Sequence, residues 1–272
     1  MPVMEMKFNS SEQQSRGSDS SVDSGPVIVE RQPVRRILVL NGKGGCGKTT
    51  ITTNLASYYA SRSIGAAIFD HDPQGSSTQW LSLREGTGRY PIHGIVAHRR
   101  PGTQMTRTWQ LRMPPGVQRV ILDAPAGVSG HQLAELVAGV DDILIPVLPS
   151  PIDIHATSRF IQDLLLVAKA RARHVRMGVI ANRVRETSKM YRSLRRFLDT
   201  LDIAFIARLR DSNNYIRAAA EGLGIHEMNE NRYRRDQVQW EKIIRWLESA
   251  EDQTVEARRS PAPARLREDR GS

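Results

Sequence analysis

The chain has 272 residues and a formal net charge of +10. Its single cysteine, Cys46, excludes an internal disulfide, and no apolar run approaches the ~20 residues that a membrane-spanning helix needs. The N-terminus lacks the apolar core of a signal peptide, so we expect a cytoplasmic protein. The positive charge predicts an acidic partner, either nucleic acid or an anionic membrane. A basic surface that only keeps the chain soluble is compatible with the same composition.

The pattern of apolar runs predicts one folded domain between two polar tails. Residues 1–33 are rich in Ser, Gln, Asp and Gly and are predicted to be a disordered leader, and residues 252–272 a disordered basic tail. The domain, residues 34–251, contains seven runs that predict strands, namely 37–40, 66–69, 94–97, 119–122, 142–147, 177–180 and 203–206. Helical patterns alternate with these runs, notably at residues 154–170, 189–201 and 237–247. The alternation predicts an α/β fold, a mostly parallel twisted sheet with helices on both faces.

A glycine-rich segment follows the first predicted strand. Residues 42–50 read Gly-Lys-Gly-Gly-Cys-Gly-Lys-Thr-Thr and fit the spacing G-x-x-x-x-G-K-[ST]. A helical pattern over residues 51–59 comes next, so backbone N–H groups of the turn and the positive end of a helix can converge on a phosphate chain. The pattern predicts that Lys48 reaches the outer phosphates and that Thr49 holds Mg²⁺. We therefore expect nucleotide contacts from Gly42, Lys43, Gly44, Gly45, Cys46, Gly47, Lys48, Thr49 and Thr50.

Aspartates follow two other predicted strands. Asp70 and Asp72 come after residues 66–69, and Asp123 comes after residues 119–122. Because the carboxyl ends of parallel strands meet at the ligand crevice, these side chains are expected to face the phosphates. Asp123 suits the strand-end aspartate that holds Mg²⁺, while one of the other two would assist the metal and one would orient the attacking water. Taken alone, each aspartate is more typical of a turn or a helix cap.

The loop also has a second lysine, Lys43, five residues before Lys48. This pair of lysines resembles the deviant Walker A motif of the ParA/MinD ATPases, which are SIMIBI-type P-loop NTPases. The segments Asp70-His-Asp72-Pro-Gln-Gly-Ser and Asp123-Ala-Pro strengthen the resemblance, as do residues 145–151 and 181–183. It covers about residues 35 to 250. A departure is Ala126, where the family often has a second proline.

The resemblance implies an ATPase that binds ATP and Mg²⁺ and forms a sandwich homodimer, in which Lys43 of each subunit reaches the nucleotide of the other. It implies catalytic roles for Lys43, Lys48 and Asp72, with Asp72 positioning the water. It places Thr49, Asp70 and Asp123 at the metal, and it implies that Asn182 contacts the adenine. For Cys46 two interpretations remain, a redox-sensitive thiol or a small side chain that fills a variable position, and we favour the second.

The output of such an ATPase differs between branches of the family. One cysteine cannot supply the ligands of an iron–sulfur cluster, which excludes the nitrogenase-iron-protein-like branch. The proline-containing tail lacks the amphipathic helix of MinD-like membrane binders, so no membrane partner is expected. Non-specific double-stranded DNA of the nucleoid, the matrix of ParA proteins, is the expected partner. The candidate DNA-binding residues are Arg183, Lys189, Arg192, Arg195, Arg196, Arg232, Arg234 and Arg235.

The cargo is suggested by two further segments. Residues 149–157 and 209–215 resemble a subgroup of short ParA-like proteins that includes McdA-type carboxysome positioners. This favours distribution of carboxysomes or a similar protein cargo, with a small adaptor protein that stimulates hydrolysis. A plasmid or chromosome partition ATPase is the alternative within the family. A metabolic P-loop phosphotransferase or ligase, which would pass the phosphate to a small molecule, is the alternative outside it.

Overall fold

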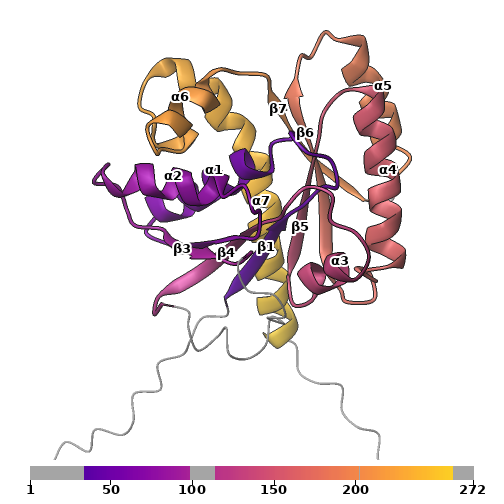
Figure 1. The fold of residues 1–272 in the computed structure, drawn as a ribbon, viewed down its shortest axis with the longest axis horizontal. Coiled ribbons are helices and arrows are strands. Elements are labelled where there is room, and N and C mark those ends of the chain that lie inside the picture. Colours follow the sequence, from indigo (N-terminus) through magenta and orange to yellow (C-terminus); the bar gives the residue numbers. More distant parts are fainter. Residues whose placement is uncertain (1–33, 99–113, 202, 260–272) are drawn as a thin grey trace, which may run out of the picture. The chain divides into compact units, whose positions relative to one another are not determined.

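The computed structural model describes residues 34–98, 114–201 and 203–259, with side chains described as far as Ser249. The predicted leader and the last residues of the predicted tail, 260–272, lie outside this part of the chain. Among the described residues the chain forms seven strands that pair in one sheet, in the order β3-β2-β4-β1-β5-β6-β7 (Figure 1). All six pairings are parallel. The predicted fold class is therefore confirmed.

The strands are the apolar runs of the sequence, extended by a few residues. They are β1 (Arg35–Val39), β2 (Gly65–Asp70), β3 (His93–Val96), β4 (Val117–Asp123), β5 (Asp142–Val147), β6 (Arg176–Val184) and β7 (Ala204–Arg210). The central strands are buried on both faces, which explains why their sequences are continuous apolar runs instead of alternating ones. After β1 the chain crosses to β2 on one side, and after β4 it crosses to β5 on the other. The carboxyl end of β1 is thus the switch point at which α/β sheets bind ligands.

Helices cover both faces of the sheet (Figure 1). One face carries α1 (Lys48–Ser61), α2 (Ser76–Glu85), α6 (Asn214–Ala220), the short 3₁₀ helix η2 (Ile225–Glu227) and α7 (Asn231–Arg259). The other carries α3 (Gly130–Val137), α4 (Pro151–Leu166) and α5 (Lys189–Leu198). Each face buries its own apolar cluster. One stripe of α7, formed by Trp240, Ile243, Ile244 and Leu247, is buried against the sheet.

Several helix ends differ from the sequence prediction; α5, for example, ends at Leu198 and not at residue 201. Helix α4 stops at Leu166 and not at residue 170, because Lys169 adopts a left-handed conformation (φ 51°) and the N–H of Ala170 turns back to the carbonyl of Leu164. Helix α7 continues to Arg259 and so passes residue 252, where the sequence places the start of the disordered tail. Residues 251–259 contain neither glycine nor proline, and Pro261 restricts the backbone only beyond them. The helical part of the chain is therefore longer than predicted.

Candidate functional site

The glycine-rich loop joins the carboxyl end of β1 to the first turn of α1, where the N–H of Ile51 bonds to the carbonyl of Gly47. Gly45 and Gly47 have positive φ values of 75° and 98°, which glycine adopts without strain. At Gly47 a Cβ atom would also lie 2.1 Å from Nδ2 of Asn182. The sequence therefore needs glycine here for both backbone conformation and space. The loop has the shape that lets main-chain N–H groups face an anion.

The two lysines of the loop differ in their surroundings. Lys48 is buried, and its ammonium group is near the carbonyl oxygens of Lys43 (3.3 Å) and Asn41 (3.5 Å). Among the described residues it forms no ion pair, so a buried cation faces the inside of the loop and favours an anion there. Lys43 is exposed at the tip of the loop. Its side chain is thus accessible to a group outside this subunit.

Asn41 supports the loop and was not identified from the sequence. Its buried side chain donates from Nδ2 to the carbonyl of Pro146 (2.7 Å) and to the hydroxyl of Thr157 (3.3 Å), and its Oδ1 accepts from the N–H of Lys43 (3.1 Å). One residue further, the carbonyl of Gly42 accepts from the N–H of Gly127. These contacts tie the loop to β5, to α4 and to the segment after Asp123. An asparagine after a strand looks like an ordinary turn residue, and no sequence signal set it apart.

Asp123 ends β4 beside the loop and is almost completely buried. Neither carboxylate oxygen has a hydrogen-bond partner among the described residues. Burial raises the pKa of Asp123 to about 7, and the neighbouring Asp70 raises it further, against the lowering effect of the nearby Thr49 and Ser77 hydroxyls and of Lys48. A buried carboxylate without a partner is unfavourable unless a cation or proton compensates it. This carboxylate, with Thr49 beside it, therefore fits a magnesium ion held by oxygen ligands.

Asp70 and Asp72 have different partners. The carboxylate of Asp70 accepts three hydrogen bonds, from the N–H of Asp72 (3.1 Å) and from the N–H (3.0 Å) and hydroxyl (2.6 Å) of Thr78 at the start of α2. Asp70 is also the register partner of Asp123 on the neighbouring strand. Asp70 thus fixes α2 to the strand ends beside Asp123. Its hydrogen bonds to Thr78 were not predicted from the sequence. Asp72 is half-buried, with Oδ1 accepting from the N–H of Gln74 (3.0 Å).

Asn182, near the end of β6, touches the loop directly. Its Nδ2 donates to the carbonyl of Cys46 (2.8 Å), and its Oδ1 accepts from the N–H of Arg183 (3.0 Å). Cys46 itself is buried, and its thiol is 3.3 Å from the carbonyl of Lys43. Burial raises the pKa of this thiol, which is the opposite of what a reactive cysteine needs. The interpretation of Cys46 as a small packing side chain is the one that this environment favours.

The sheet separates the basic residues into two groups. Lys189, Arg192, Arg195 and Arg196 are exposed on α5, on one face, and Arg232, Arg234 and Arg235 are exposed at the start of α7, on the other. The start of α7 is joined to the edge strand β7 by the ion pair between Asp236 and Arg210. The Arg195 guanidinium lies over the ring of Phe205 on β7 (4.6 Å). Arg183 is exposed at the end of β6. These exposed basic residues therefore lie on both faces of the sheet near its β7 edge, and we call them the basic band.

The segment 209–215 anchors α7. The buried carboxylate of Asp236 on α7 accepts hydrogen bonds from Arg210, from Ser212 and from Nδ2 of Asn214. The same Asn214 amide group also donates to the carbonyl of Arg232 (3.0 Å). The residues that suggested a subgroup in the sequence thus hold the end of the helix that carries Arg232, Arg234 and Arg235.

Comparison with known proteins agrees with this geometry. Residues 37–225, more than half of the chain, match the family described as "CobQ/CobB/MinD/ParA nucleotide binding domain". The chain belongs to this family. The match includes every residue of the phosphate loop and all three candidate strand-end aspartates.

Within the CobQ/CobB/MinD/ParA family, two relatives share a name. The maintenance of carboxysome distribution protein A of Halothiobacillus neapolitanus is 27% identical over 71% of this chain and 87% of its own, and that of Gloeobacter kilaueensis is 28% identical over 79% and 94%. Among solved structures, an ATP complex of a variant of Cyanothece McdA has a TM-score of 0.59 at 17% identity, covering 78% of this chain and 97% of that one. At this identity the structure supports the fold, that of ParA/MinD P-loop NTPases. No helix in the described part of the chain is long and apolar enough to cross a membrane.

Proposed function

We propose that this family member is a ParA-type ATPase that binds ATP with Mg²⁺ and hydrolyses it to ADP and phosphate. The observation that carries the proposal is that Lys48 and Asp123, both buried and both close to Thr49, have no ionic partner among the described residues. The loop N–H groups and Lys48 would bind the phosphates, and Thr49 and Asp123 would hold Mg²⁺. The metal ion would neutralise part of the negative charge on the phosphates. Asp72, half-buried beside these groups, would position the attacking water.

Dimerisation is the proposed consequence of ATP binding. Lys43 is exposed at the tip of the loop, where a second subunit could bring its own loop close. A cation supplied by the partner would complete each nucleotide site, so that the nucleotide state sets the association state. After hydrolysis the homodimer would dissociate into its two subunits.

The dimer is proposed to bind nucleoid DNA through the basic band around β7. The exposed arginines on α5 and α7 are suited to phosphate contacts, which give affinity without reading sequence. Distribution of carboxysomes or a similar protein cargo is the favoured task, because both relatives above are named for it. A small adaptor that stimulates hydrolysis would couple the cargo to the ATPase. Such a protein would be cytoplasmic and associated with the nucleoid.

Binding of a fluorescent random-sequence duplex tests the proposal. We expect binding with ATP and Mg²⁺ and little binding with ADP, together with a steep dependence on salt. The pair Arg192→Ala and Arg196→Ala, or Arg232→Ala and Arg235→Ala, should weaken binding and reduce the salt slope. As a matched control, Arg62→Ala with Arg89→Ala removes two exposed arginines elsewhere. If ATP-loaded protein leaves the duplex unbound even at low salt, the DNA-matrix function is wrong.

Two further measurements separate the alternatives. Transfer of the γ-phosphate to a small molecule instead of water would identify a metabolic P-loop enzyme. In cells, a fluorescent fusion that follows labelled carboxysomes supports the favoured cargo, whereas one that follows replication origins or a plasmid identifies a partition ATPase.

A further inference from the structure

The connection between α4 and β6 carries a run of basic residues that the proposed function does not use. Lys169, Arg171, Arg173 and His174 are all exposed, whereas Ala168, just before them, and Ala170, between them, are fully buried. The connection precedes β6, so it lies at the amino end of the parallel strands, and the phosphate loop lies at the carboxyl end. This surface is therefore distinct from the nucleotide site.

The connection is held by main-chain hydrogen bonds, and its residue types are not explained by its shape. Main-chain hydrogen bonds join the N–H of Arg173 to the carbonyl of Lys169 (3.1 Å) and the N–H of Val175 to that of Ala170 (3.1 Å). Lys169 and His174 both have left-handed backbones, with φ values of 51° and 56°. Such a conformation costs a residue with a side chain about 1 kcal/mol or more, and glycine avoids this cost. A lysine and a histidine at these two positions, where glycine would be less costly, thus point to a use outside the fold.

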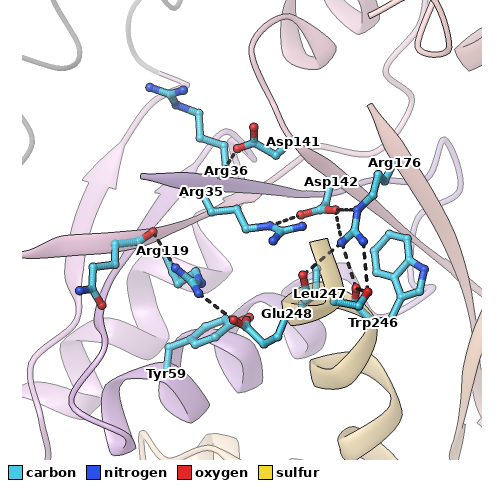
Figure 2. A network of polar contacts seen from close by, with 12 residues as sticks. Arg35, Arg36, Tyr59, Arg119, Asp141, Asp142, Arg176, Trp246, Leu247 and Glu248 are labelled. Carbon is cyan, nitrogen blue, oxygen red and sulfur yellow. Dashed lines mark hydrogen bonds and ion pairs between the residues drawn. The ribbon is translucent and has the colours of Figure 1, made fainter. Parts of the chain in front are cut away.

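Two carboxylates at this end of the sheet, those of Asp142 and Glu248, already have partners, as Figure 2 shows. Asp142 is bound by Arg35 (2.6 Å) and Arg176 (2.8 Å), and Arg176 also donates to carbonyls of α7. Glu248 is bound by Arg119 and by the hydroxyl of Tyr59. These carboxylates are therefore not available to neutralise the cations of the connection.

Lys169 and Arg173 form no ion pair with any described residue. The only hydrogen bond that a side chain of these two makes within the described part of the chain joins Nε of Arg173 to the carbonyl of Ala168 (3.1 Å). Directly before them, Leu166 is 76% exposed and Val167 is 45% exposed at the end of α4. Two protruding aliphatic side chains thus lie next to cations that lack an acidic partner in the described part of the chain.

We propose that Leu166, Val167, Lys169, Arg173 and His174, together called the α4–β6 surface, bind an acidic protein segment with aliphatic side chains between its carboxylates. The carboxylates complement the cations, and the aliphatic groups cover Leu166 and Val167, which a sugar–phosphate backbone would leave in water. The inference requires neither ATP turnover nor DNA binding. A segment bound here leaves the mouth of the nucleotide site open.

The test uses the full chain and a fluorescein-labelled peptide of repeating Glu-Glu-Leu, compared with one of repeating Glu-Glu-Ser. Fluorescence anisotropy should show tighter binding of the leucine peptide. The variant Lys169→Glu with Arg173→Glu should weaken its binding by about tenfold or more. Leu166→Ser should remove the preference for leucine. The variant Lys169→Ala with Arg173→Ala, which adds no new charge, should weaken binding in the same direction, and thermal melting establishes that each variant is folded.

The matched control is Lys242→Glu with Arg245→Glu, which changes one lysine and one arginine that are exposed on α7. It gives the same change in net charge and should leave peptide binding within about twofold of the unmodified protein. Equal weakening by the control overturns the proposal, because net charge alone would then explain binding. A random duplex and vesicles of anionic lipid complete the test. If Lys169→Glu with Arg173→Glu weakens binding to either of them as much as to the peptide, the surface serves nucleic acid or membrane and the proposal is wrong.

Discussion

The side-chain amide of Asn182 donates a 2.8 Å hydrogen bond to the carbonyl oxygen of Cys46, so the end of β6 is joined to the middle of the phosphate loop. Both residues are buried. The amide lies so close to Gly47 that no side chain fits there. Asn182 therefore shapes the loop, whether or not it also contacts a base.

We expect Asn182→Ala to lower ATP affinity by roughly tenfold, because it leaves a buried carbonyl unpaired and removes the support of the loop. The measurement is titration with a fluorescent ATP analogue, with Asn213→Ala as an exposed asparagine control. If Asn182 acts only on the loop, Asn182→Ala should lower the affinity for GTP by the same factor as the affinity for ATP. A selective loss of ATP over GTP would instead support the predicted adenine contact. Unchanged affinity for both nucleotides would contradict the structural role.

Substitutions of Lys43 and Lys48 should affect different steps, Lys48 the binding of ATP and Lys43 the dimerisation that follows. Lys48 faces the inside of the loop, so Lys48→Ala should abolish productive ATP binding. Lys43 is exposed, so Lys43→Ala should keep ATP binding within a few-fold but lose the ATP-dependent dimer. Analytical ultracentrifugation with ATP and Mg²⁺ measures the second effect. A Lys43→Ala protein that still dimerises on ATP would show that the lysine is not supplied in trans.

The strands were predictable from the sequence because buried parallel strands are continuous apolar runs, and all seven were found. The phosphate loop was predictable because its spacing is specific. Other features depend on three-dimensional neighbours. Periodicity shows which residues share a helix face but not which face of the sheet the helix covers. The sequence pattern therefore did not reveal that the sheet lies between the basic residues of α5 and the arginines of α7. Likewise, Asn41 and the Thr78 contact of Asp70 join segments that have no pattern in common.

Asp72→Ala should retain ATP binding and dimerisation but slow hydrolysis, since Asp72 is half-buried beside the strand ends and is proposed to position water. The dimer should then accumulate and remain on DNA. Release of phosphate, measured under conditions that saturate ATP, is the readout, and sedimentation reports the dimer. Rapid turnover by Asp72→Ala would assign water positioning to another residue. Asp70→Ala should behave differently, by loosening α2 through loss of the Thr78 contacts.

Arg84 and Glu227 form a buried bidentate ion pair that joins α2 to η2, with distances of 2.8 Å from Nη1 to Oε2 and 2.7 Å from Nη2 to Oε1. Glu227→Ala should reduce the free energy of unfolding by about 3–5 kcal/mol, because it leaves the Arg84 charge buried without its partner. Replacing both residues, with Arg84→Met and Glu227→Leu, should recover part of the loss. Urea unfolding measures both variants. Asp199→Ala breaks the exposed pair with Arg195 and should change stability by less than about 1 kcal/mol. A similar small loss in Glu227→Ala would contradict the prediction.

His226 should make stability depend on pH. It packs against the rings of Tyr58 (4.9 Å) and Trp240 (6.0 Å), and burial, with a contribution from Arg62, lowers its pKa to about 4. Unfolded histidine takes up a proton near pH 6.5, so between pH 6.5 and 4 the unfolded chain binds more protons than the native one. Stability is therefore complete above pH 6.5 and falls as the pH drops through this range. The loss for this group is about 3 kcal/mol at most, from 1.4 kcal/mol per pKa unit.

Urea unfolding at pH 7 and pH 5 measures this dependence. His226→Phe should keep the aromatic packing and show a smaller loss at pH 5 than the unmodified protein. Part of the loss should remain, because burial also lowers the pKa of His71 to about 4. His155→Phe, which changes an exposed histidine on α4, should lose as much stability as the unmodified protein. If His226→Phe and the unmodified protein lose stability equally between pH 7 and pH 5, the half-buried His226 does not control the acid sensitivity of the fold.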